Sequence, residues 1–176
     1  YITLQISGLR ELQRDLVDRN RKDSVQLLRI QNNLNSAAHT MRDMLDGGEP
    51  YPLGAWRPQF ERIRVDLEDA LRIEEQIGAV HRTPEQKQYV ASSMAQFWDA
   101  LERVFALAEE GKEREARAQI RNSLQARQAA LNTTVARFLV QNNENEEQAA
   151  QRIVEVYDRV QRQVYFFLAA TLAGIL

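Results

Sequence analysis

Few residues in this chain of 176 can interrupt a helix, and most of those that can lie in one short stretch. Residues 47–58 contain three of the four prolines and three of the seven glycines, so only Pro84 and four glycines remain elsewhere. Proline removes a helix hydrogen bond and glycine loosens the backbone, so their scarcity permits very long helices. Apolar residues recur at intervals of three and four and never persistently at two. The pattern predicts an all-α protein.

The breakers and the apolar spacing predict four helices. We expect the first over about Thr3 to Asp46, with Gly47 and Gly48 supplying a left-handed cap. The second begins near Pro58, which suits a first helical turn. The third begins at Pro84, because Thr83 can cap it and Gln86 completes a capping box, and it closes at Gly111. The fourth runs from Lys112 to Ala173, where no breaker interrupts one continuous apolar seam.

These lengths favour an antiparallel up-down-up-down four-helix bundle. The middle helices would be roughly 35–40 Å long and the first about 65 Å, from a rise of about 1.5 Å per residue. Short turns make consecutive helices antiparallel neighbours. The first and last helices would therefore continue past the other two as a two-helix stalk, with facing residue numbers adding to roughly 160–166 and Tyr1 beside Tyr165.

The same register brings a basic stretch of the first helix to the level of an acidic stretch of the last. At this level both seams turn polar. The expected stalk polar layer consists of Arg19, Arg21, Lys22, Glu144, Glu146 and Glu147. The alternative is that these are two independent solvated runs, which would contribute little to stability.

The last thirteen residues carry no charge and follow Arg159 and Arg162. Tyr165, Phe166 and Phe167 lie where charged sequence gives way to apolar sequence, as interfacial aromatic residues do in membrane proteins. A complete span needs about 20 residues, so we expect a transmembrane helix to begin at 164–176 and to continue beyond it. The expected domains are then a water-facing bundle at 1–163 and this membrane segment. The alternative is an amphipathic helix that ends a soluble protein.

Composition excludes several chemistries. A net charge of −2 without a basic cluster argues against nucleic-acid binding. The absence of cysteine excludes disulfides and thiolate sites. His39 and His81 lie on different helices without a partner at ligand spacing, so we expect no metal site. No phosphate-binding loop or nucleophile motif is present, and we expect no cofactor and no catalysis by this chain.

Two helix faces could bind a small anion at the end of the bundle opposite the stalk. Residues three or four apart share a helix face, and arginine binds carboxylates through paired hydrogen bonds. The candidate ligand-binding residues are Asn35, His39 and Arg42 on the first helix and Arg114, Arg117 and Arg121 on the last. Alternatively, these arginines pair with Asp43, Glu113 and Glu115 as ordinary surface ion pairs.

Such an architecture resembles the extracytoplasmic four-helix sensor domains of bacterial chemoreceptors and two-component sensor histidine kinases. Segments 107–111, 115–118 and 142–145 look like the junction between the third and fourth helices of that superfamily. Segments 41–45, 50–53 and 56–60 look more like histidine kinases. The Arg-Gly-Tyr signature of related CHASE-type sensors is replaced here by Arg42-Asp43-Met44.

The resemblance implies a periplasmic domain at the bacterial inner membrane that acts as a homodimer. It would sense a small anionic ligand or a periplasmic protein, and it would pass the stimulus along the fourth helix to kinase domains that lie outside this chain. A chemoreceptor ligand-binding domain and a non-sensing structural bundle are the alternatives.

Overall fold

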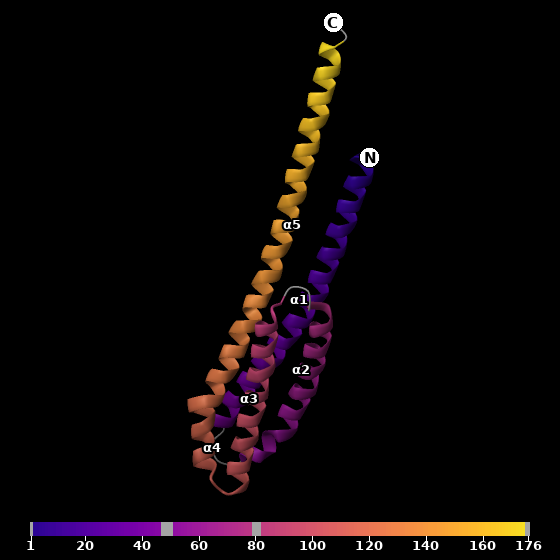
Figure 1. The fold of residues 1–176 in the computed structure, drawn as a ribbon. Helices are drawn as coiled ribbons and strands as arrows, with labels where there is room; N and C mark the ends of the chain where they lie inside the picture. The colour runs from indigo at the N-terminus through magenta and orange to yellow at the C-terminus, as the bar shows by residue number, and fades with distance from the viewer. Residues whose placement is uncertain (1, 47–50, 79–81, 175–176) are drawn as a thin grey trace. The chain divides into compact units, whose positions relative to one another are not determined.

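The structure, a computed structural model, describes residues 2–46, 51–78 and 82–174. Apart from short turns, the described chain is helical, and it contains no strand. Its elements are α1 (Ile2–Asp46), the 3-10 turn η1 (Leu53–Trp56), α2 (Arg57–Gly78), α3 (Pro84–Glu109), α4 (Glu113–Gln119), η2 (Ile120–Leu124) and α5 (Gln125–Ala173). The predicted all-α class is confirmed, and Figure 1 shows how these helices follow one another along the chain.

The ends of α3 follow from side-chain chemistry at both termini. Thr83 accepts a hydrogen bond from the Gln86 amide at 3.1 Å, and the Gln86 side chain accepts from the Thr83 amide at 3.0 Å. This confirms the predicted capping box, with Pro84 in the first turn. At the other end Gly111 takes a φ of +78°, and the Lys112 amide donates to the Leu107 carbonyl at 2.9 Å. Only glycine adopts that conformation without strain, so α3 ends there.

The segment expected as one regular helix from Lys112 to Ala173 contains an irregularity. Residues Ile120–Leu124 form a π-helical turn between α4 and α5. The helical segment is nevertheless continuous, as predicted, and the π turn is a local irregularity that the sequence analysis did not anticipate. Both Ile120 and Leu124 are fully buried, so the wider turn keeps them in the core where one extra residue is accommodated.

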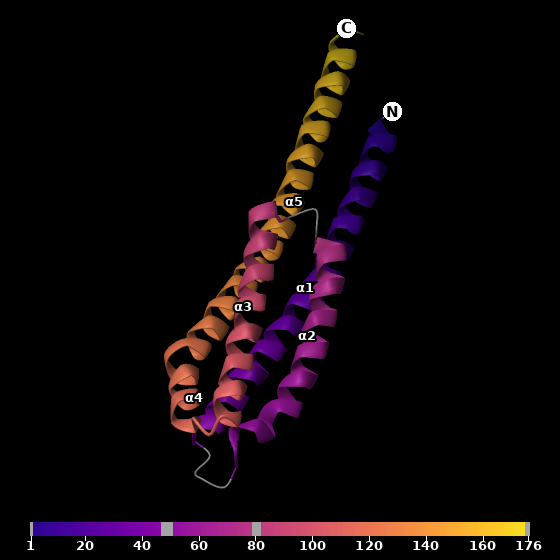
Figure 2. The ribbon, with the colours of Figure 1, turned by 60° about the horizontal axis from the view of Figure 1, so that its bottom comes forward.

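The chain divides into two compact units. The larger is Lys22–Leu139, and the smaller combines Tyr1–Arg21 with Val140–Leu176. In the larger unit, α2 and α3 lie alongside the part of α1 after Arg21 and the part of the α4–η2–α5 segment before Val140 (Figures 1 and 2). All of these helices contribute buried apolar side chains to one core, among them Leu34, Phe60, Phe97, Phe105 and Ile120.

The smaller unit contains the first part of α1 and most of α5. Asn20 and Asn142 are buried, and the Asn20 side-chain amide donates to the Asn142 carbonyl oxygen at 3.2 Å. Towards the end of α5 every described side chain from 161 onward is exposed. No helix in the described part of the chain meets the length and hydropathy needed to cross a membrane.

Several expectations concern residues outside the described part of the chain. These are the pairing of Tyr1 with Tyr165, the cap at Gly47 and Gly48, and the position of His81. The described end of α1 at Asp46 agrees with the predicted end of the first helix.

Candidate functional site

The predicted anion-binding residues of α1 lie on the surface. Asn35, His39 and Arg42 are all exposed. Asn35 accepts a hydrogen bond at 3.3 Å from Asn132 of α5, so its oxygen serves a contact between helices.

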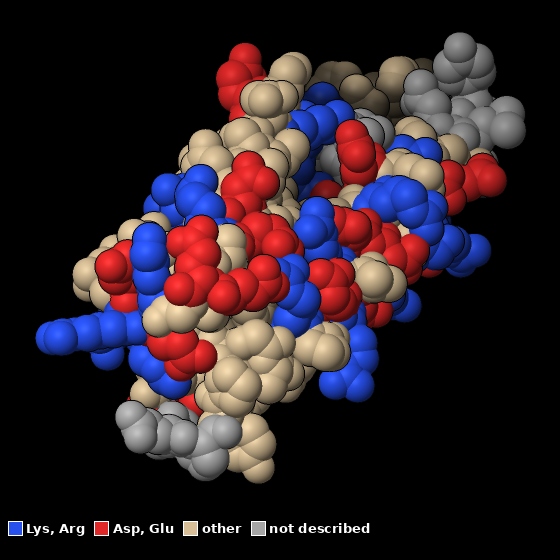
Figure 3. Space-filling model, turned by 90° about the horizontal axis from the view of Figure 1, so that it is seen from below, with Lys and Arg blue, Asp and Glu red and all other residues tan. Residues whose placement is uncertain are grey.

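Arg117 is the most constrained of the three predicted arginines. It is half-buried, donates to the Met44 carbonyl oxygen of α1 and lies 3.6 Å from Glu113. Arg114 and Arg121 are exposed. No hydrogen bond or ion pair joins any two of the six predicted ligand-binding side chains, all of which are described. Figure 3 shows Lys and Arg side chains interspersed with Asp and Glu, without a broad area of one sign. The anion site stays a prediction, and Arg117 is used to hold α4 against α1.

The charged residues of the predicted stalk polar layer do not pair with one another. Arg19, Arg21, Glu144 and Glu147 are exposed and Glu146 is half-buried, and no ion pair joins these five described side chains. Lys22 is exposed and belongs to the larger unit. The buried polar contact at this level is the one between Asn20 and Asn142.

The larger unit contains a buried arginine that the sequence analysis did not single out. The Arg82 side chain is 5% exposed, and its carboxylate partners Asp23 and Glu74 are 4% and 11% exposed. Its guanidinium lies 3.1 Å from Asp23 of α1 and forms a second ion pair with Glu74 of α2. The same group lies over the Phe138 ring of α5, 4.4 Å from the centroid. We call Arg82, Asp23, Glu74 and Phe138 the arginine centre.

The two carboxylates of the arginine centre lie at helix positions where the sequence pattern predicts buried apolar residues. Asp23 lies three residues after the buried Asn20 and four before the buried Leu27. Glu74 lies four residues after the buried Ala70. A charged residue in a core position needs a partner, because an unpaired buried charge is very costly. The pattern could therefore have indicated a buried cation, but it could not indicate that Arg82, outside any helix, supplies it.

The arginine centre leaves one strong donor without an acceptor. The Arg82 Nε is buried and makes no hydrogen bond within the described chain. Two carboxylates around one guanidinium give the centre a formal charge of −1. The Phe138 ring face adds a favourable contact to the cation, since a ring face carries partial negative charge.

A cavity of about 160 Å³ lies beside the arginine centre. We call it the α2–α3 cavity. Its walls are formed by Leu71, Glu74, Glu75, Arg82, Lys87, Val90, Ala91 and Phe138. The lining is mostly apolar, and the charged groups are two acids and two bases. A shallower hollow farther along α2 and α3 shares Leu71 and Ala91 with it and is lined in part by the buried Trp98. The Trp98 indole N–H makes no hydrogen bond to any residue that the structure describes.

A surface ion cluster joins α1 to α2. Arg29 forms ion pairs with Asp66 and, at 3.0 Å, with Asp69. Hydrogen bonds from Arg29 and then from Asn33 lower the pKa of Asp66, while bonds from Arg72 and Arg29 lower the pKa of Asp69. The carboxylates are accordingly held ionised in the folded chain.

Asp66→Asn should remove part of the acid sensitivity of the larger unit. The pKa of Asp66 is lowered by folding, so its stabilisation is full above the unfolded value of about 4 and is lost as the pH falls through the folded value. The melting temperatures of the two chains should therefore differ at pH 7 and converge towards pH 3. The difference should be small and shrink in high salt, because the side chain is 45% exposed. A difference that grows on acidification would contradict the assignment.

Metal chemistry has no evident place in the described chain. No group of three or more His, Cys, Asp or Glu side chains there is arranged to hold a metal ion.

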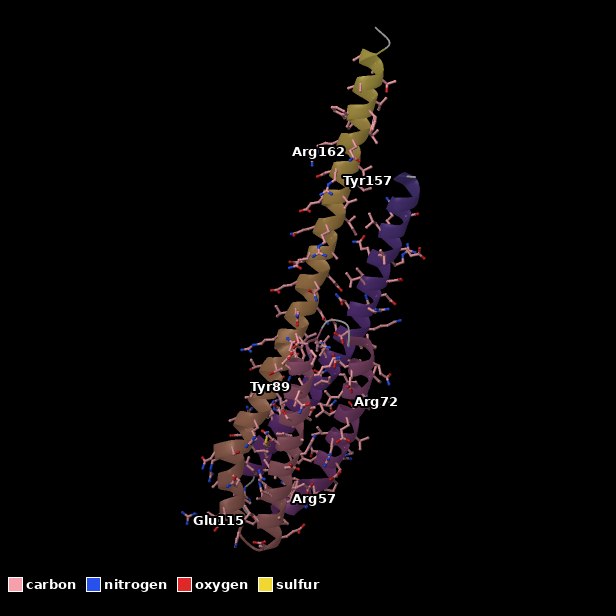
Figure 4. The ribbon with its side chains drawn as sticks, viewed as in Figure 1. Arg57, Arg72, Tyr89, Glu115, Tyr157 and Arg162 are labelled. Atoms are coloured by element: carbon pink, nitrogen blue, oxygen red, sulfur yellow. The ribbon has the colours of Figure 1, made fainter. Side chains whose placement is uncertain are left out.

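Figure 4 shows the side chains along the ribbon. The labelled Arg57 lies near the start of α2, and the labelled Tyr157 and Arg162 lie on the later part of α5. Arg57 pairs with Glu102 and Glu109 of α3.

Likeness to known proteins adds no identification. Comparison with protein-family models, with curated proteins and with solved structures gives no match to this chain.

Proposed function

We propose that this chain is the extracytoplasmic sensor domain of a receptor in the bacterial inner membrane, of the two-component sensor histidine kinase type. One observation carries the proposal. Both α1 and α5 extend, as single helices, from the larger unit into the smaller one, and α5 ends in an exposed apolar segment. Continuous helices of this kind can carry a displacement from a folded domain to a membrane.

The proposed fold is an antiparallel up-down-up-down bundle. It is supported by contacts in which the residue number rises along one helix and falls along its neighbour. Between α1 and α2 the contacts are Arg29 with Asp66 and Thr40 with Gln59. Between α1 and the α4–η2–α5 segment they are Leu34 with Gln128 and Met44 with Arg117. Between α2 and α3 they are Phe60 with Phe105 and Arg64 with Trp98. The α1 contacts with Gln128 and Arg117 fall within the register expected from the sequence.

The proposed membrane anchor is the apolar end of α5. Tyr165, Phe166 and Phe167 are exposed, and Phe166 is 74% exposed. Exposed aromatic residues after a charged stretch suit the boundary between water and lipid. We place residues 1–163 in the periplasm.

The proposed receptor is a homodimer. Leu12 of α1 and Val154 and Tyr157 of α5 are large apolar side chains that the smaller unit leaves exposed. A second copy that packs against these helices would cover them, and two isolated helices bury too little apolar surface to be stable alone.

Stiffening the Asn20–Asn142 contact should reduce signalling. Both side chains are buried in the smaller unit, and a buried amide in a helix seam costs stability relative to leucine. In the full-length receptor, Asn20→Leu with Asn142→Leu should hold the pair of helices in one arrangement and cut the response to stimulus by about tenfold. Autophosphorylation of the receptor in membrane vesicles measures this response.

The matched control and the readout separate the alternatives. Arg19→Leu with Asn143→Leu changes exposed neighbours on the same two helices and should leave the response unchanged. Methylation in place of phosphorylation would make the parent a chemoreceptor. The sensor proposal would be overturned if the receptor were neither phosphorylated nor methylated and its output were the same in the asparagine variants. That result would favour a structural bundle.

A further inference from the structure

The exposed side of α1 in the larger unit carries no charge. Six residues at 25–39 are exposed, and none of them is Lys, Arg, Asp or Glu. Two of the six are the aliphatic residues Val25 and Leu28, which are 55% and 48% exposed. Arg29 is the one residue of these four charged types at 24–41, all of which the structure describes. Its ion pairs with Asp66 and Asp69 turn it towards α2 and away from this surface.

The exposed side of α5 in the same unit is uncharged as well. Four residues at 126–133 are exposed, three of them alanine and the fourth Thr133. Arg127 is the one charged residue at 125–136, a range that the structure describes completely, and it is turned towards α3, where it donates to Gln96 at 3.0 Å. By contrast, five of the eight exposed residues at 58–76 of α2 and five of the twelve exposed residues of α3 are charged.

The two uncharged stretches lie on one surface. Asn132 of α5 donates to the side-chain oxygen of Asn35 of α1 at 3.3 Å in an exposed hydrogen bond. Residues three or four apart share a helix face, so Asn32 lies beside Asn35 on α1 and Ala129 lies beside Asn132 on α5. We call the exposed residues at 25–39 and 126–133 together the α1–α5 face.

The chemistry of the α1–α5 face suits a second copy of the chain. In a two-fold symmetric contact both partners present the same surface, so a charge near the axis meets a like charge, and this face has none to oppose. The side-chain amides of Asn32 and Asn35 both donate and accept hydrogen bonds, so each can pair with an identical group. The centres of protein interfaces are in general depleted of charged residues. A partner of a different kind is normally selected by complementary charges, which this face lacks.

We propose that the larger unit dimerises through the α1–α5 face, which packs against the same face of a second copy of the chain. Val25 and Leu28 supply the apolar contacts, and the small side chains of α5 let the two copies approach closely. This inference rests on the proposed homodimeric receptor, for which it names the contact surface of the larger unit. Asn35 and His39, which were predicted to bind an anion, would lie within this contact.

Cysteine cross-linking in the full-length receptor tests the contact. The 176 residues include no cysteine, so an introduced one reports a single position, and the receptor without it is the blank. Val25→Cys lies in the α1–α5 face, whereas Val65→Cys replaces an exposed valine of α2 outside it. With a short bismaleimide in membrane vesicles, Val25→Cys should give a covalent dimer and Val65→Cys none above the blank. Equal yields, or no dimer above the blank at Val25, would overturn the face.

A charge placed in the face should weaken the contact. Leu28→Glu, added to the Val25→Cys receptor, puts a carboxylate of each copy at the contact, and the cross-linked fraction should fall about tenfold. Val65→Glu makes an equivalent change at an exposed α2 position and should leave that fraction unchanged. Circular dichroism should show the parent helix content in both variants, because both positions are exposed. An undiminished cross-link in Leu28→Glu would contradict the proposal.

A third position, Leu12→Cys in the smaller unit, separates this inference from the proposed function. Cross-linking at Leu12 without cross-linking at Val25 overturns the α1–α5 face and leaves the homodimer. Cross-linking at Val25 in a receptor whose output is the same in the asparagine variants overturns the sensor proposal and leaves the face. No cross-link at either position overturns both the face and the homodimer.

Discussion

Arg82→Met is expected to destabilise the larger unit by about 3–5 kcal/mol. The substitution keeps the bulk of the side chain and removes the cation that pairs with the nearly buried carboxylates of Asp23 and Glu74. Both carboxylates would then lose the guanidinium while they stay largely shielded from water, and the contact to the Phe138 ring would be lost. Urea unfolding followed by circular dichroism measures the free energy of unfolding.

A triple variant distinguishes a lost ion pair from lost packing. Replacing a buried ion cluster by apolar residues of similar volume is often neutral or stabilising. Arg82→Met combined with Asp23→Leu and Glu74→Leu should therefore recover most of the loss. Arg64→Met, a half-exposed arginine that also stacks on an aromatic ring, should cost about 1 kcal/mol or less. A single Arg82→Met variant as stable as wild type would contradict the arginine centre.

Deleting one residue should have opposite consequences inside and outside η2. Removal of the exposed Asn122 lets the π turn close into a regular α-helix, because such a turn accommodates one extra residue. The helix after it keeps its facing, and we expect a loss within about 2 kcal/mol. Removal of the exposed Ala130 instead rotates everything after it by about 100°.

The Ala130 deletion should unfold the larger unit. Leu131, Val135 and Phe138 follow it and are buried in the core, and each large side chain lost from a core costs about 2–5 kcal/mol. Thermal unfolding of the two deletion chains provides the measurement. Equal damage by both deletions would show that η2 does not absorb a residue.

The helices were predictable because their ends depend on local chemistry. Thr83, Pro84 and Gln86 lie within four residues, and their hydrogen bonds need no distant partner. Gly111 ends α3 through its own backbone freedom. The apolar spacing of α1 likewise located the core residues Leu27, Ile30 and Leu34.

The π turn and the arginine centre depend on distant contacts. Spacings of three and four fit Ile120 and Leu124 equally well with or without an extra residue in the turn, so η2 leaves no trace in the pattern. Arg82 meets Asp23 across 59 positions of the chain, and nothing near either residue indicates the other.

The predicted anion site shows the limit of shared helix faces. His39 and Arg42 share a face of α1, but their spacing says nothing of whether that face turns inward, and both are exposed. Arg117 does reach α1, where it meets the Met44 backbone carbonyl. Whether such a side chain contacts another helix depends on tertiary packing, which the spacing of residues along one helix does not determine.

The amide contact between Asn20 and Asn142 has a consequence for folding accuracy. Two long amphipathic helices can pair in several alignments, shifted by seven residues, that bury similar apolar surface. In each shifted alignment the Asn20 side-chain amide would leave the Asn142 backbone carbonyl, and both buried asparagine side chains would face other positions of the partner helix, which penalises the wrong pairings. The asparagines thus make the native alignment unique, at some cost in the total stability of the pair. In the chain with leucine at both positions we therefore expect the native alignment to form more slowly, and the pair of helices to be held more tightly once it has formed.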